Sequence, residues 1–154
     1  MKRSQIKKGT KQLKRSGFKK ATRGSKLASK KRKPKKRQKT QAQLKKELDR
    51  VFSIYIRQKF PQECYTCRKQ AVTLQCGHFV SRQYLATRWD EDNCRPQCIG
   101  CNIYGHGKPL DFEERLKKDL GEKHVEKMKF SRHTVLKLDR QWYKEQIEHY
   151  KSLI

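Results

Sequence analysis

The sequence predicts a small α+β protein in which a zinc-bound middle segment is flanked by helices and preceded by a basic N-terminal arm. Three observations predict this: most of the excess charge lies near the N-terminus, apolar residues recur at helical spacing on both sides of the middle segment, and four cysteines form two CxxC pairs. The net charge of +26 over 154 residues indicates a polyanionic partner. Nucleic acid fits this charge better than an acidic membrane surface does. No run approaches the roughly 20 apolar residues of a membrane span, so none is expected.

The arm is residues 1–40, which hold 19 Lys and Arg and no acidic residue. We expect it to be disordered in the free protein and to bind DNA phosphates without selecting a sequence. Its densest part also matches a nuclear-localisation pattern, which stays open. The arm lacks the apolar core of a secretory signal, so a cytoplasmic protein that is not secreted is expected. The candidate nucleic-acid contacts in this run are Lys31, Arg32, Lys33, Lys35, Lys36 and Arg37.

Residues 41–154 are predicted to form one body that begins with a helix over 41–60. Thr40 and Gln43 fit a capping box at its start, and Pro61 marks its end. Apolar residues then recur three and four positions apart, which predicts one face packed on the core. That face consists of Leu44, Leu48, Val51, Phe52, Tyr55, Ile56 and Phe60.

The next segment, residues 61–108, contains two CxxC knuckles, Cys64–Cys67 and Cys98–Cys101. Each knuckle presents two thiolates from one tight turn, and two knuckles supply the four ligands of a structural Zn²⁺. A redox dithiol is disfavoured because neither knuckle lies in a βαβ pattern. Thirty residues separate the knuckles, more than the roughly 15–20 of a plain zinc ribbon. Short strands are predicted at 71–74 and 78–80.

Two further cysteines, Cys76 and Cys94, lie between the knuckles. They are most simply small buried apolar residues. Either could instead replace a knuckle cysteine, or both could join histidines at a second zinc ion.

Residues 109–154 return to helical patterns. Pro109 opens a helix that Gly121 closes, and a short helix is expected over 122–129. Ser131 is expected to cap a last helix, whose inner side would carry Val135, Leu138, Trp142, Ile147 and Tyr150.

The segment between the knuckles contains "CGHF" and "DNCRPQCIGCN", which set His78, Asn93 and Asn102 in order. This order resembles the HNH (His-Me finger) endonucleases in their zinc-stapled form. More narrowly, residues 64–107 resemble the phage recombination nucleases of the lambda NinG (Rap) family. The resemblance implies a ββα-metal, treble-clef-like core that holds a catalytic Mg²⁺ or Mn²⁺.

The resemblance also implies a role for each matching residue. His78 would be the general base that activates water, Asn102 would bind the catalytic metal, and Asn93 would hold the loop that connects hairpin to helix. Such relatives often carry an acidic metal ligand where this chain has Gly77. Asp90, Glu91 or Asp92 could compensate, or His106 could join Asn102 at the metal.

DNA contacts are expected near these residues because guanidinium groups bind phosphate bidentately. The candidates are Arg82, Arg88 and Arg95, while Tyr84 and Trp89 could stack on bases. Core packing is the commoner role of a tryptophan.

The sequence thus predicts a metal-dependent DNA endonuclease, and the resemblance implies branched or looped recombination intermediates as its substrate. Two alternatives stay open: a noncatalytic zinc-finger nucleic-acid binder, and a site-specific HNH nuclease of homing or restriction type. The last helix could form a homodimer through its apolar face, or that face could equally pack inward on the rest of the chain.

Overall fold

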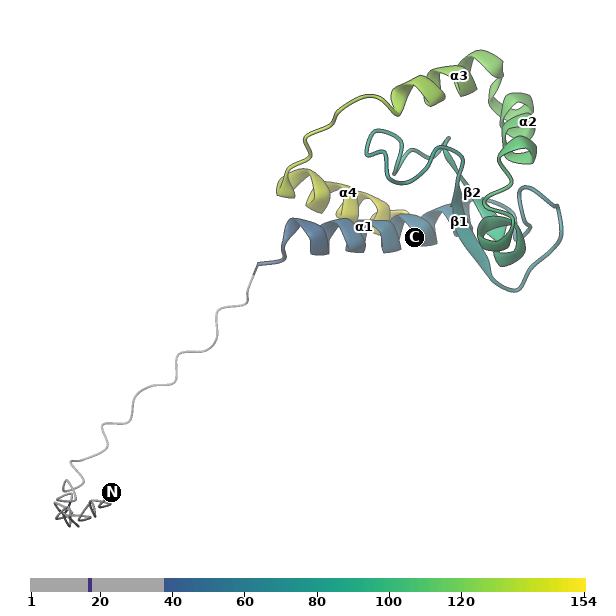
Figure 1. Ribbon diagram of the computed structural model, residues 1–154. Coiled ribbons are helices and arrows are strands. Elements are labelled where there is room, and N and C mark those ends of the chain that lie inside the picture. Colours follow the sequence, from purple (N-terminus) through teal and green to yellow (C-terminus); the bar gives the residue numbers. More distant parts are fainter. Residues whose placement is uncertain (1–16, 18–37) are drawn as a thin grey trace, which may run out of the picture. The chain divides into compact units, whose positions relative to one another are not determined.

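The computed structural model describes Gly17 and residues 38–154, and these residues form a small α+β fold with one two-stranded sheet and five helices (Figure 1). The predicted arm contacts at residues 31–37 lie outside the described residues. The elements are α1 (Gln41–Lys59), β1 (Leu74–His78), β2 (Cys94–Cys98), the π-helix η1 (Gly100–Tyr104), α2 (Pro109–Leu120), α3 (Glu122–Ser131) and α4 (Arg140–Ser152). Within the described residues, no helix is both long and apolar enough to cross a membrane.

Helix α1 begins with the predicted capping box. The Thr40 hydroxyl accepts from the Gln43 amide at 3.3 Å, and the Gln43 side chain accepts from the Thr40 amide at 2.8 Å. These two bonds satisfy backbone donors that have no partner inside the helix. The predicted apolar face is confirmed as core, since Leu44, Leu48, Val51, Phe52 and Ile56 are buried.

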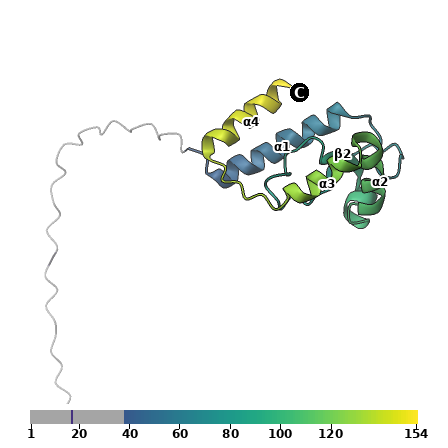
Figure 2. The same cartoon turned by 90° about the horizontal axis from the view of Figure 1, so that it is seen from above.

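Helix α4 packs along α1, as both views show (Figures 1 and 2). The Tyr150 ring meets the edge of Phe52 with centroids 5.0 Å apart. Trp89, from the loop between the strands, joins the same cluster. Trp89 is therefore a core residue in this fold. The apolar side of α4 packs against α1.

The hairpin differs from the predicted strands at 71–74 and 78–80. One strand, β1, runs from Leu74 to His78, and its antiparallel partner β2 begins sixteen residues later, at Cys94. Residues paired across an antiparallel sheet share a face. The face toward α1 therefore carries Cys76, His78 and Cys94, and the opposite face carries Gln75, Gly77, Arg95 and Gln97.

Helices α2 and α3 cover a second apolar cluster of Tyr65, Phe112, Leu116 and Val125. Pro109 opens α2, and Gly121, at φ 86°, separates α2 from α3 as predicted. The predicted start of the last helix is wrong, because Ser131 ends α3 and Asp139 caps α4 by accepting from the Trp142 amide at 2.8 Å. Val135 lies between the two helices and is 86% exposed.

Candidate metal centre and pocket

The two cysteine knuckles come together as one cluster. The sulfurs of Cys64, Cys67, Cys98 and Cys101 all lie within 4.8 Å of one another, and Cys67 and Cys98 are 3.9 Å apart. Four sulfurs at about 2.3 Å from a tetrahedral Zn²⁺ would be about 3.8 Å apart. The cluster can therefore hold a structural zinc ion with little movement.

Local backbone geometry builds each knuckle. In the first, the Arg68 amide donates to the Cys64 carbonyl at 2.8 Å, and Arg68 adopts φ 60°, which closes the turn. In the second, Cys98 ends β2 and Cys101 lies in η1. The hairpin, the first knuckle and η1 therefore meet at this cluster.

The thiols of this cluster differ in acidity. Burial opposes ionisation of Cys64, but hydrogen bonds from the Thr66 hydroxyl and from backbone amides outweigh it and lower its pKa to about 6. Burial and the neighbouring thiols raise the pKa of Cys101 to about 12. Four adjacent thiolates repel one another, and a divalent cation relieves that repulsion.

Asn93 closes the loop that joins the two strands. Its side chain is fully buried and bonds to three backbone groups: Oδ1 accepts from the Val80 amide at 2.6 Å, and Nδ2 donates to the carbonyls of Val80 at 2.9 Å and Thr87 at 2.8 Å. Its own carbonyl accepts from the Phe79 amide at 3.0 Å. Asn93 thus fixes the loop inside the hairpin, whereas the resemblance implied a loop between hairpin and helix.

His78, the last residue of β1, is oriented by this loop. Its Nε2 lies 3.1 Å from the carbonyl oxygen of Arg88. A carbonyl can only accept, so Nε2 carries the proton and donates, which leaves Nδ1 with an available lone pair. Burial lowers the pKa of His78, and the charges of Arg88 and Arg82 lower it further, against the opposing effects of the Arg88 carbonyl and Asp49.

An open pocket of about 340 Å³ brings His78, Asn102 and His106 together, along with Cys76, Ser81 and Arg82. Asn102, in η1, lines this pocket and donates from Nδ2 to Gln75 Oε1 at 2.7 Å, which leaves its Oδ1 available as an acceptor. His106 lies just after η1 with φ 49°, a conformation that histidine adopts more readily than most residues. The pocket therefore offers one amide oxygen and two imidazoles.

The nearby carboxylates do not replace the acidic metal ligand that related nucleases often carry at the position of Gly77. Asp90 accepts from the Asp92 amide, Glu91 pairs with Tyr55 and Lys59, and Asp92 pairs with His124. None of these acids lines the pocket. A divalent ion there would have neutral protein ligands, Asn102 Oδ1 and His106, and would take its remaining oxygen ligands from phosphate and water.

Gln97 explains why residue 77 is a glycine. A Cβ on Gly77 would lie 2.7 Å from Cδ and 2.9 Å from Cγ of the fully buried Gln97 side chain. Gln97 donates from Nε2 to the Thr66 hydroxyl at 3.1 Å and to the Gly107 carbonyl at 2.8 Å, linking the first knuckle to the turn after η1. Gln97 was not among the predicted site residues, because nothing in its local sequence pattern marks a buried amide.

The three candidate arginines differ in their surroundings. Arg82 is exposed at the pocket. Arg88 forms a bidentate pair with Asp49, at 2.8 Å from Nε and 2.6 Å from Nη2. Arg95 is 4% exposed, donates to three backbone carbonyls, and stacks over Phe60 with the guanidinium carbon 4.5 Å from the ring centroid. The geometry argues against the phosphate contacts expected of Arg88 and Arg95, because their guanidinium groups already serve the fold.

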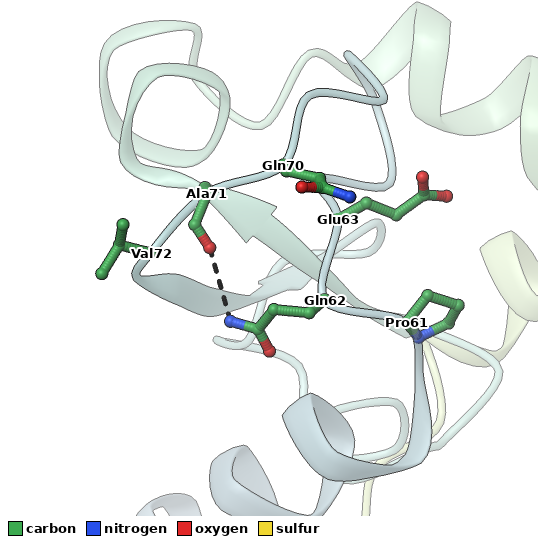
Figure 3. Close-up of a pocket in the computed structure, with 6 residues that line it drawn as sticks. All are labelled: Pro61, Gln62, Glu63, Gln70, Ala71 and Val72. Carbon is green, nitrogen blue, oxygen red and sulfur yellow. Dashed lines mark hydrogen bonds between the residues drawn. The ribbon is translucent and has the colours of Figure 1, made fainter.

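A separate pocket beside the first knuckle contains none of the predicted catalytic residues (Figure 3). The Gln62 side chain crosses it to the Ala71 carbonyl at 3.4 Å. Glu63 is the ionisable residue among its lining residues, and it pairs with Arg68. We assign this pocket no chemistry.

The fold and its two knuckles define a small α+β protein with a cysteine cluster able to hold zinc. The chain belongs to the family described as Bacteriophage Lambda NinG protein, which matches residues 1–154. Membership identifies it as a phage recombination-related protein. No curated protein and no solved structure matches the chain.

Proposed function

We propose that this protein is a metal-dependent DNA endonuclease of the HNH type that acts on branched or looped recombination intermediates. One observation supports it most: the imidazole of His78 donates from Nε2 to a backbone carbonyl and lines the same pocket as Asn102 and His106. Membership in a phage recombination family supports DNA as the substrate.

His78 would act as the general base. With its proton fixed on Nε2, Nδ1 accepts a proton from the water that attacks the scissile phosphorus. Because burial lowers the pKa of His78, the ring is neutral at pH 7 and ready to accept that proton. Asn93 serves this step indirectly, since it fixes the loop that carries the Arg88 carbonyl.

Asn102 and His106 would hold a divalent cation, Mg²⁺ or Mn²⁺. Such an ion, when bound, relieves the charge that builds on the phosphate in the transition state. Asn102 is held by Gln75 on β1, so the amide oxygen keeps a fixed position relative to the hairpin. The exposed Arg82 would contact a neighbouring phosphate.

The test compares nicking of supercoiled, linear and four-way DNA with and without Mg²⁺. Mg²⁺ should be withdrawn by dialysis, with zinc content measured, because a chelator could also strip the cysteine cluster. His78→Ala should lower the nicking rate by about 10²–10⁴-fold while zinc content and DNA affinity stay unchanged. His133→Ala, which removes an exposed imidazole elsewhere, is the matched control. Wild-type nicking without any divalent cation, or full activity of His78→Ala, would refute the proposal.

A noncatalytic zinc-dependent DNA-binding protein is the second candidate. It is favoured by the lack of a carboxylate among the residues that line the pocket of His78, Asn102 and His106. It predicts tight DNA binding and no strand cleavage under any metal condition, so the same assay separates the two functions.

A further inference from the structure

We propose that Cys76, His78 and Cys94 form a second transition-metal site, distinct from the four-cysteine cluster, which takes Zn²⁺ or a similar borderline-soft divalent ion. A sulfur of each cysteine and a ring nitrogen of His78 all lie within 4.8 Å of one another. No disulfide links these cysteines, and neither belongs to a CxxC knuckle.

The hairpin register places these three side chains together. Cys76 and His78 are two residues apart on β1, so both point to the face toward α1. Cys94 on β2 is directly opposite His78 and therefore points the same way. Paired strands, and not a flexible loop, set the spacing of the three ligand atoms.

The chemistry of this set suits zinc. Two thiolates and one imidazole are ligands that Zn²⁺ prefers, and three protein ligands leave a fourth position for water or another small ligand. Cys94 is fully buried and forms the closed side of the site. Cys76 and His78 each line two pockets, one with Asp49 and Ser53 and one with Asn102, so the fourth position is reachable from solvent.

Occupation of this site would have a consequence that rests on the proposed function. If the ion bound Nδ1, it would take the lone pair that accepts the proton from water. If it bound Nε2, it would displace the hydrogen bond to the Arg88 carbonyl. Either way His78 could not act as the base, so zinc at this site would inhibit a Mg²⁺-dependent nuclease.

The test counts zinc ions on the full-length protein. Protein saturated with Zn²⁺ and then desalted is weighed by native mass spectrometry, and its zinc is measured independently by elemental analysis. Wild type should carry two ions per chain, and Cys76→Ala and Cys76→Ser should each carry one. Cys76 is chosen because it is partly exposed, whereas Cys94 is fully buried.

His106→Ala is the matched control, because it removes a ligand of the proposed Mg²⁺ pocket and leaves Cys76, His78 and Cys94 intact. It should still carry two zinc ions. A single ion on wild type, retention of both ions by the Cys76 variants, or loss of one ion in His106→Ala would overturn the proposal. Titration of metal-free wild type with Co²⁺ checks the result without a variant, since the second ion should add sulfur-to-cobalt absorption from two thiolates.

Inhibition is scored separately as the ratio of nicking rates with and without added Zn²⁺. The ratio should fall well below one for wild type and stay near one for Cys76→Ala, whatever the absolute rate of that variant. If no nicking occurs under any condition, the proposed nuclease fails while the ion count still decides whether the second site exists.

Discussion

At the level of single residues, the proton on Nε2 of His78 decides what the ring can do. The Arg88 carbonyl holds that proton, so Nδ1 stays an acceptor as long as the ring is neutral. Burial first, and then the charges of Arg88 and Arg82, make protonation of the ring harder and lower its pKa. The same surroundings therefore fix both the orientation of the ring and its charge.

This lowered pKa predicts the acidic limb of the pH–rate profile. A general base works only when deprotonated, so activity is present above its pKa and lost as pH falls through it. Because the pKa of His78 lies below its ordinary value of 6.5, half-maximal kcat/KM should fall at a pH below 6.5. Nicking rates measured across the acidic range at constant Mg²⁺ check this. A midpoint above 6.5 would mean that another group controls the reaction.

Gly77 gives a prediction about stability. Gly77→Ala forces a methyl group against the side chain of Gln97, which two hydrogen bonds hold in place. Overpacking of this kind costs about 1–3 kcal/mol, measured as a lower free energy of unfolding in urea. Gly100→Ala is the control, because its Cβ would meet Cys98 Sγ at an ordinary 3.8 Å. Equal stability of the two variants would show that Gln97 moves aside easily.

At the level of elements, α1 helps to position His78 indirectly, through hydrogen bonds to the loop between the strands. Asp49 of α1 accepts from Arg88 twice and from the Trp89 indole at 3.0 Å. The backbone carbonyl of Arg88 then accepts from His78. Asp49 is therefore a positioning residue for the ring, although it does not touch it.

Asp49→Ala should lower kcat and leave DNA affinity unchanged. It removes three hydrogen bonds from the loop, which should also cost about 1–3 kcal/mol of stability. Glu47→Ala is the matched control, since Glu47 is also on α1 and pairs with Lys39 and Lys151 away from the pocket. Asp49→Asn, which keeps one acceptor oxygen, should recover part of kcat. An unchanged kcat in Asp49→Ala would exclude this positioning role.

The elements that the sequence predicted well are those whose sequence features lie within the element itself. The capping box of α1 spans four adjacent residues, and the apolar period of α1 repeats within the helix, so both could be recognised directly. The hairpin could not, because β2 contains Arg95, Pro96 and Gln97, and none of these is typical of strands. Strand β2 is held by Asn93 and runs into the second knuckle, which begin fifteen and twenty residues after the end of β1. The cap predicted at Ser131 is wrong for a related reason: Asp139 is an equally suitable capping residue, and no local signal distinguishes the two.

The candidate site divides in the same way. The CxxC spacing was enough to predict the four-cysteine cluster. The carboxylate that pairs with Arg88 belongs to Asp49, 39 positions away, and the ring under Arg95 belongs to Phe60, 35 positions away, so no local pattern could reveal these two contacts. The same holds for Gln97, whose contact with Gly77 exists only once the strands pair.

At the level of the whole molecule, the charge is divided very unevenly. Residues 1–36 carry 17 of the 41 Lys and Arg and no acidic residue. Phosphate contacts by such a segment release counterions, and each contact adds about 0.9 to the slope of log affinity against log salt. We therefore expect this segment to provide general DNA affinity, while the pocket of His78, Asn102 and His106 carries the proposed chemistry.

Deletion of residues 1–36 should weaken DNA binding and reduce its salt dependence while leaving the body folded. This boundary keeps Thr40, which caps α1, and the Lys39 carbonyl, which accepts from Arg140. Fluorescence anisotropy with one DNA at several salt concentrations measures both quantities. An unchanged slope after deletion would assign DNA binding to the body alone.

The most direct test of the account is chemical rescue of a His78→Gly variant. The variant should lose nicking activity, and added imidazole should restore part of it in proportion to its concentration, because free imidazole can replace the missing proton acceptor in the pocket. His106→Gly should show no comparable rescue of proton transfer, since that side chain is assigned to metal binding. If His78→Gly nicks DNA as fast as wild type, or if imidazole restores nothing while the variant remains folded and DNA-bound, His78 is not the base.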